Sequence, residues 1–168
     1  IKQIRDINVS DARLREEFGV IDTPDWSLRQ ARINLMEDSD WENKIRLCQY
    51  RPFDYRWIFY DDSFVERPSY PVVGHFRHNN LGLTTTRQTT TIGFEHLLAT
   101  KYVTEYKCVS HDRGSYSFPL YLYPQTEIEK RTGASRSPNL APAFIKDFAE
   151  RLGMEFINDG KGDRTKSF

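Results

Sequence analysis

Apolar residues recur at helical spacing near both ends of the chain. Residues 10–19 begin with Ser10, which suits an N-cap, and end with Gly19, which suits the left-handed position after a helix. Pro24 follows a capping threonine, a favourable start for a second helix. A third apolar stripe at helical spacing closes at Gly153. The pattern therefore predicts helices over residues 10–19, 23–36 and 139–153.

Between these helices, β-branched and aromatic residues alternate with polar ones, as in half-buried strands. The predicted strands cover 41–60, interrupted at 51–54, and then 81–86, 91–99, 102–109 and 116–123. A short helix is expected over 72–78 and a loop over 125–138. Because the connections are short, most strand pairs should be antiparallel. The expected fold class is α+β, with a central mostly antiparallel sheet from about 41 to 123 flanked by the N-terminal helices and one C-terminal helix.

Composition narrows the class of protein. With 168 residues, 38% of them hydrophobic, the chain can bury one core, and no run of about 18 apolar residues could cross a membrane. The opening residues IKQIR contain neither an initiator methionine nor a signal segment, which indicates a fragment of a longer protein. Cys48 and Cys108 could pair, but two buried thiols in a reducing compartment are favoured, so a cytoplasmic location is expected.

Charge is balanced overall, with 24 basic and 24 acidic side chains, so no global field favours nucleic acid. The distribution is less even. Residues 64–126 carry 6 basic and 4 acidic side chains and all four histidines, whereas residues 1–63 carry 10 and 13. An anion-binding face is therefore expected in the middle segment.

Common catalytic signatures are absent from the sequence, including phosphate-binding glycine loops, the zinc-protease helix motif and the serine-hydrolase elbow. Cys108 and His111 supply two possible zinc ligands, but a structural site needs about four. The pair Asp61 and Asp62 could be catalytic carboxylates, although a solvated turn after a strand explains them better. A free-standing hydrolase is not favoured.

The stretch LGLTTTRQTTTI, at 81–92, places an arginine and a glutamine between two threonine runs. Period-two alternation puts Leu83 on one strand face and Thr84 on the other. Because an extended strand would bury Arg87 on the leucine side, the strand should end or bulge near Thr86 and present Arg87 and Gln88 from a hairpin tip. Arginine can bind guanine, glutamine can bind adenine, and threonine can contact phosphate or a thymine methyl. Alternatively, the threonines only favour β structure and Arg87 pairs with a carboxylate inside the domain.

Four blocks together resemble the C-terminal specificity domain of type ISP restriction-modification enzymes. The blocks are YRPFDYR at 50–56, NLGLTTTRQ at 80–88, YSFPLYLYP at 116–124 and RSPNLAP at 136–142. The resemblance implies a target-recognition part of a single polypeptide that also carries nuclease, ATPase and adenine-N6 methyltransferase parts. The methyltransferase motif of the Asn-Pro-Pro-Tyr type is absent, so that chemistry is expected upstream of Ile1. An apolar segment that usually follows the last helix is also absent, which indicates a truncated recognition domain.

The resemblance assigns roles along the chain. Residues 1–40 would link to an upstream methyltransferase domain, 41–155 would form the recognition domain, and 156–168 would be a flexible tail. The fragment itself should have no catalytic residue, metal or cofactor, whereas the parent would use S-adenosylmethionine, ATP and Mg. Residues 50–56 are interpreted as structural rather than DNA-reading, and residues 107–115 as a second polar turn near the DNA. The expected contacts to double-stranded DNA are Thr84, Thr86, Arg87, Gln88, Thr89, Lys101, Lys107, Ser110, His111 and Arg113.

A second hypothesis is an interdomain or protein-interaction domain without DNA affinity, which would use the chain's 23 aromatic residues as anchors. It predicts an exposed apolar patch, whereas the DNA hypothesis predicts a basic face that includes Arg87, Lys101, Lys107 and Arg113.

Overall fold

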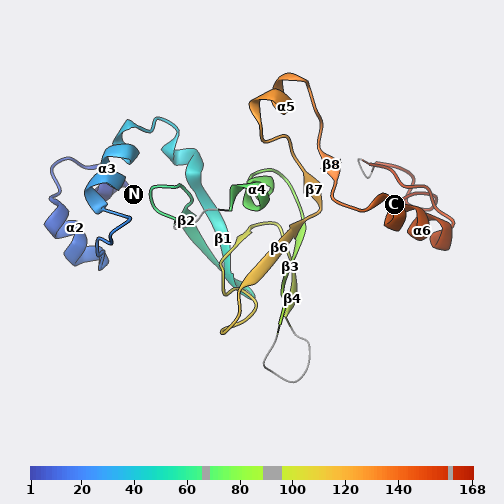
Figure 1. The fold of residues 1–168 in the computed structure, drawn as a ribbon, viewed down its shortest axis with the longest axis horizontal. Coiled ribbons are helices and arrows are strands. Elements are labelled where there is room, and N and C mark those ends of the chain that lie inside the picture. The colour runs from blue at the N-terminus through green and yellow to red at the C-terminus, as the bar shows by residue number, and fades with distance from the viewer. Residues whose placement is uncertain (66–68, 89–95, 159–160) are drawn as a thin grey trace.

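The computed structural model describes residues 1–65, 69–88, 96–158 and 161–168. Figure 1 shows helices at one end of an elongated molecule, strands in the centre and a C-terminal arm at the other end. The helices are α1 (Lys2–Arg5), α2 (Asp11–Phe18), α3 (Leu28–Glu37), α4 (Tyr70–Val73), α5 (Glu127–Arg131) and α6 (Pro142–Leu152), with short 3-10 helices η1 (Trp41–Lys44) and η2 (Gly74–Arg77). The strands are β1 (Ile45–Arg51), β2 (Asp54–Phe59), β3 (Gly82–Thr86), β4 (Leu97–Thr100), β5 (Val103–Thr104), β6 (Ser115–Pro119), β7 (Tyr121–Leu122) and β8 (Ser137–Pro138). The α+β class is confirmed.

Local signals fix the ends of two predicted helices. Ser10 accepts a hydrogen bond from the backbone of Arg13 at the start of α2, and Gly19 and Gly153 end α2 and α6 with φ of 62°. α3 begins later than predicted, because Ser27 supplies its cap. Residues 23–26 instead form a turn in which two backbone hydrogen bonds close the chain on itself.

The N-terminal helices pack around their own small core, in which Leu14, Leu28 and Leu35 are fully or almost fully buried. Arg32 lies in this core and donates to the carbonyls of Ile4 (2.9 Å) and Asp6 (2.8 Å), as well as to the Asp11 carboxylate. A buried guanidinium is tolerated when its donors are satisfied in this way.

In residues 1–65, 69–88, 96–158 and 161–168, the strands form two three-stranded sheets and one pair rather than one continuous sheet. Their orders are β2-β1-β5, β4-β3-β6 and β7-β8. Among the strands that the structure describes, the pairs are antiparallel except β1 with β5. Within the described residues, the predicted strand over 102–109 reduces to β5 because the chain turns after Thr104, and the strand over 116–123 divides at Leu120. The region predicted as a loop contains α5, whose first turn is fixed by a capping box of Thr126 and Glu129.

Three hydroxyl groups join the two larger sheets. Thr84 of β3 hydrogen-bonds Ser117 of β6 at 3.0 Å, and Ser117 hydrogen-bonds Thr104 of β5 at 2.7 Å. Thr84 is fully buried. We call Thr84, Ser117 and Thr104 the hydroxyl chain, and it satisfies polar groups that would otherwise be buried without partners.

The buried face of β3 is the opposite of the one its apolar residues indicate. Gly82, Thr84 and Thr86 are buried, whereas Leu81 and Leu83 are 43% and 50% exposed. The reason is a close packing contact: the ring of Phe76 lies so close to Gly82 that an added Cβ would be 2.5 Å from its Cζ. The outer face, which we call the apolar sheet face, carries Leu83, Leu97, Tyr116 and Phe118, all at least 44% exposed.

The C-terminal arm is built around α6, which has no buried residue. Phe144 and Phe148 stack at 5.4 Å between ring centroids, and Phe168 packs edge-on against Phe148. The tail therefore returns along α6, and Ile157 donates to the carbonyl of Phe168 at 3.0 Å. Within the segment expected to be flexible, Phe168 thus contacts Phe148 of this helix as well as Phe156 and Ile157.

Candidate nucleic-acid interface

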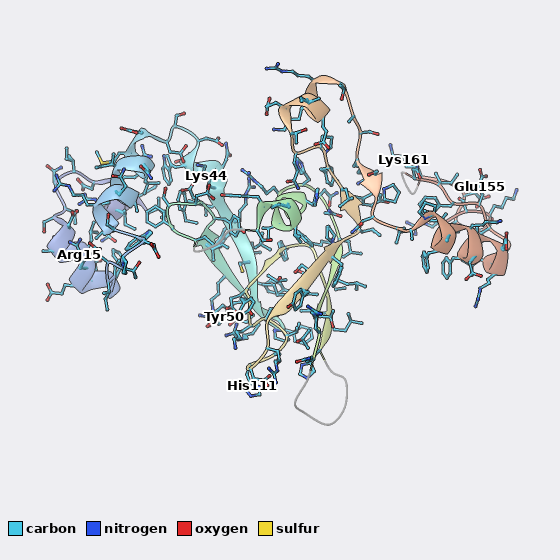
Figure 2. All side chains as sticks on the ribbon, in the orientation of Figure 1. Arg15, Lys44, Tyr50, His111, Glu155 and Lys161 are labelled. Atoms are coloured by element: carbon cyan, nitrogen blue, oxygen red, sulfur yellow. The ribbon has the colours of Figure 1, made fainter. Side chains whose placement is uncertain are left out.

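Three connections meet at one end of the central sheets. They are the β1–β2 turn with its flanks (residues 51–56), the residues after β3 (87–88) and the loop 105–114. We call this set the loop surface. Figure 2 labels Tyr50 and His111, which both lie at this end. The described part of the loop surface carries five basic side chains and three acidic ones. The basic side chains are Arg51, Arg56, Arg87, Lys107 and Arg113, and the acidic ones are Asp54, Glu105 and Asp112.

Glu105 joins two of these connections. Its Oε2 accepts from Arg51 Nη1 at 2.5 Å and from the backbone N–H of Lys107 at 2.7 Å, while its own N–H donates to the carbonyl of Gln49 at 3.0 Å. The loop 105–114 is thereby fastened to the end of β1.

The same loop is also fastened to the end of β3. The N–H of Ser115, which pairs with Thr86, donates to the carbonyl of Tyr106 at 2.6 Å. His96 Nδ1 lies 2.6 Å from the carbonyl oxygen of Val109. Because a carbonyl oxygen can only accept a hydrogen bond, Nδ1 is the donor. The three connections therefore hold fixed positions relative to one another.

Arg87 and Gln88 directly follow Thr86, where β3 ends, as the strand end predicted near Thr86 requires. Both are exposed. The Arg87 guanidinium lies 5.8 Å from the centroid of the Tyr116 ring, a cation–π contact. Thr89 falls outside the described residues.

Thr84 and Thr86 are not available at this surface, although they were expected to contact DNA. Thr84 is fully buried in the hydroxyl chain, and Thr86 is 6% exposed and donates to the carbonyl of Gln88 at 2.9 Å. Their role is to hold the strand end that presents Arg87.

The remaining predicted residues divide between two places. Lys107, His111 and Arg113 belong to the loop surface, where His111 and Arg113 are exposed. Ser110 is 6% exposed and donates to Asp112 at 2.7 Å, so it shapes the loop instead of facing outward. Lys101 is exposed but follows Thr100, which pairs with Gly82 at the opposite end of β3 from Arg87.

Two arginines at this end were not predicted as DNA contacts. The guanidinium carbons of Arg51 and Arg56 lie 4.0 and 3.7 Å from the centroid of the Tyr50 ring, so the ring lies against both. Arg56 also pairs with Asp54 at 3.0 Å. The block of residues 50–56 contained both arginines, and the contact of Arg51 with the distant Glu105 joins this block to the loop 105–114.

The two cysteines, Cys48 and Cys108, are buried thiols and do not have the environment of a reactive thiolate. Cys108 is buried, and burial, followed by the charge of Glu105, raises the pKa of its thiol to about 11. Among the described residues, no group of three or more histidine, cysteine or carboxylate side chains is placed to hold a metal ion. In the same residues, no helix has both the length and the apolar character needed to cross a bilayer.

Comparison with known proteins adds two findings. The family described as the Type ISP C-terminal specificity domain matches residues 1–166. The cryo-EM structure of a DrdV–DNA complex contains a chain of similar fold, with a TM-score of 0.57 and 16% sequence identity. The match covers 90% of this chain and 14% of that one, so this chain spans about a seventh of the length of the solved protein. No curated protein matches the sequence significantly.

Proposed function

The chain belongs to the Type ISP C-terminal specificity domain family, and from this premise we propose that it is a module that recognises a specific sequence in double-stranded DNA. The observation that carries the proposal is the loop surface, where three connections held by backbone and carboxylate contacts gather an excess of basic side chains. A rigid basic surface of this kind suits contacts to phosphates, and its exposed polar side chains suit contacts to base edges.

Arg87 and Gln88 are the residues best suited to read bases. Arginine offers two parallel donors to guanine, and glutamine pairs its amide with adenine. Both side chains are exposed at the end of a strand whose position is fixed by the hydroxyl chain. Lys107, His111 and Arg113 lie beside them on the loop 105–114 and are suited to phosphate oxygens.

The activities of the whole polypeptide are also proposals. In this reading an upstream domain methylates adenine at N6 with S-adenosylmethionine, and further parts cleave unmodified DNA with ATP and Mg, whereas residues 41–155 select the site and contribute no catalytic group. Residues 1–40 would connect the upstream domain to the recognition domain. The end of this segment is tied to the recognition domain by Lys44, which forms ion pairs with Asp38 (2.9 Å) and Asp61 (2.7 Å).

A second role, docking onto another part of the polypeptide, is favoured by the apolar surfaces. The apolar sheet face and the exposed Phe144 and Phe148 of α6 are groups of neighbouring apolar side chains, whereas single exposed apolar residues are normal on a protein surface. Such groups of apolar side chains suit a contact with another part of a larger protein. This role would accompany DNA recognition and does not replace it.

The test is a selection from random duplex DNA with the intact polypeptide, scored by sequencing the bound DNA and, separately, by adenine methylation. A defined motif is expected from the wild type. Arg87→Ala should relax the preference at one base pair, while Arg131→Ala, an exposed arginine on the distant α5, should leave the motif unchanged. Binding without any motif, or a motif that Arg87→Ala does not alter, would contradict the assigned reading role.

A further inference from the structure

The β1–β2 turn presents an aromatic ring in an unusual way. Arg51 pairs with Asp54, so Pro52 and Phe53 are the two central residues of the turn. Phe53 has a φ of 64°, the only positive φ of a residue other than glycine among the described residues, and it is 85% exposed. The conformation and the exposure are both unfavourable for phenylalanine.

The turn does not itself require this residue. Pro52 holds φ near about −65°, which excludes the mirror-image turns that need positive φ at the first central position. A positive φ at the second position is the mark of a type II turn, where glycine or asparagine is preferred. Phenylalanine at this position therefore makes the turn less stable than glycine would.

Packing does not compensate for this cost. The Phe53 ring stays largely in solvent, and among the residues that the structure describes no aromatic or cationic side chain stacks on it. A strained, solvent-exposed aromatic residue that stacks on none of the described residues suits a contact made outside this domain.

Cation–π contacts and ion pairs hold the base of the turn. Tyr50 lies against the guanidinium groups of Arg51 and Arg56, which are 38% and 57% exposed and are further held by Glu105 and Asp54. Phe53 therefore projects from a fixed mount that belongs to the loop surface.

We propose that Phe53 is a DNA wedge: its ring inserts beside the site read by Arg87 and stacks on a partly opened base step. This inference rests on the proposed function. DNA is favoured over a protein partner because Phe53 projects beside the guanidinium groups of Arg51 and Arg56, which suit phosphates, and belongs to the loop surface with its excess of basic side chains. The wedge would favour flexible pyrimidine–purine steps, which open most easily, and so add preference at a position without a hydrogen-bonded base contact.

The experiment uses the intact polypeptide and duplexes carrying the motif found by selection. Phe53→Gly should bind about tenfold more weakly, the scale expected for loss of one aromatic stacking contact. The dependence on salt should not change, because a neutral ring releases no counterions. 2-Aminopurine placed at the step beside the motif should brighten when the wild type binds and stay dim with Phe53→Gly. Phe53→Trp should keep both properties, and Ile128→Ala, which removes an equally exposed apolar side chain on α5, should behave as the wild type.

Thermal unfolding separates the wedge from a structural role. Phe53→Gly should melt at the same temperature as the wild type or higher, because glycine suits the turn. A lower melting temperature with unchanged DNA affinity would overturn the inference in favour of a packing contact. Equal affinity and equal 2-aminopurine signal for the two proteins would overturn the wedge alone, whereas absence of DNA binding by the wild type would overturn the proposed function first.

Discussion

The hydroxyl chain allows a graded test of how the two central sheets are held together. Replacing Thr84 by valine keeps the shape and removes one end of the chain, while Ser117 retains its bond to Thr104. The expected loss is about 1 kcal/mol in the free energy of unfolding, the net value of one hydrogen bond. Ser117→Ala removes the middle member, so two bonds are lost and the fully buried Thr84 hydroxyl has no partner. Because an unsatisfied buried hydroxyl adds its desolvation penalty, the expected loss is roughly 2 to 3 kcal/mol.

The assay is urea unfolding of the purified chain, followed by tryptophan fluorescence and far-UV circular dichroism. Thr85→Val is the matched control, because Thr85 lies on the opposite face of the same strand and its hydroxyl makes only a 3.4 Å contact with the next carbonyl. It should change the free energy by less than about 0.5 kcal/mol. If Ser117→Ala costs no more than Thr84→Val, the hydroxyls do not act as a connected chain and the reasoning fails.

Three further predictions concern stability and reactivity. Gly82→Ala should lower the free energy of unfolding by about 1 to 3 kcal/mol, because the new methyl group would overlap the aromatic ring that packs there; urea unfolding measures this. Iodoacetamide at pH 7.5 should label Cys48 and Cys108 only after denaturation, because burial raises the pKa of both thiols to about 11, and labelling of the native chain would contradict it. Lys44→Met should make the stability of the chain depend less on acid. The hydrogen bond from Lys44 lowers the pKa of Asp38 in the folded chain. The stability that this ion pair contributes is therefore present above the unfolded pKa of about 3.9 and is lost as pH falls through the lower folded pKa. Unfolding curves at pH 3, 5 and 7 should therefore show a smaller decrease for the variant.

Local signals in the sequence were sufficient for the elements whose ends are fixed by side chains. Ser10, Gly19 and Gly153 act through hydrogen bonds or backbone conformations that each residue type supplies by itself. The capping box of Thr126 and Glu129 is an equally local signal, and it would have predicted α5.

The orientation of β3 could not be predicted in the same way. Alternation defined its two faces, and the leucines indicated which face should be buried. The opposite face is inside because the ring of Phe76 approaches Gly82 and because Ser117, 33 residues further along the chain, satisfies Thr84. The same limit applies to the candidate site. Arg87 followed from the end of a strand, whereas Arg51 joins the loop surface through Glu105, 54 residues later in the chain.

The hydroxyl chain also bears on how the protein can evolve. Its three members point into the interior between the sheets, and none of them is a side chain of the loop surface. Substitutions at Arg87 or Gln88 therefore leave the joint between the sheets intact and draw little on the small reserve of folding stability that limits most mutational paths. Lineages of this domain can thus exchange exposed residues at the strand end through a series of folded intermediates, and acquire new preferences without first gaining stabilising mutations elsewhere.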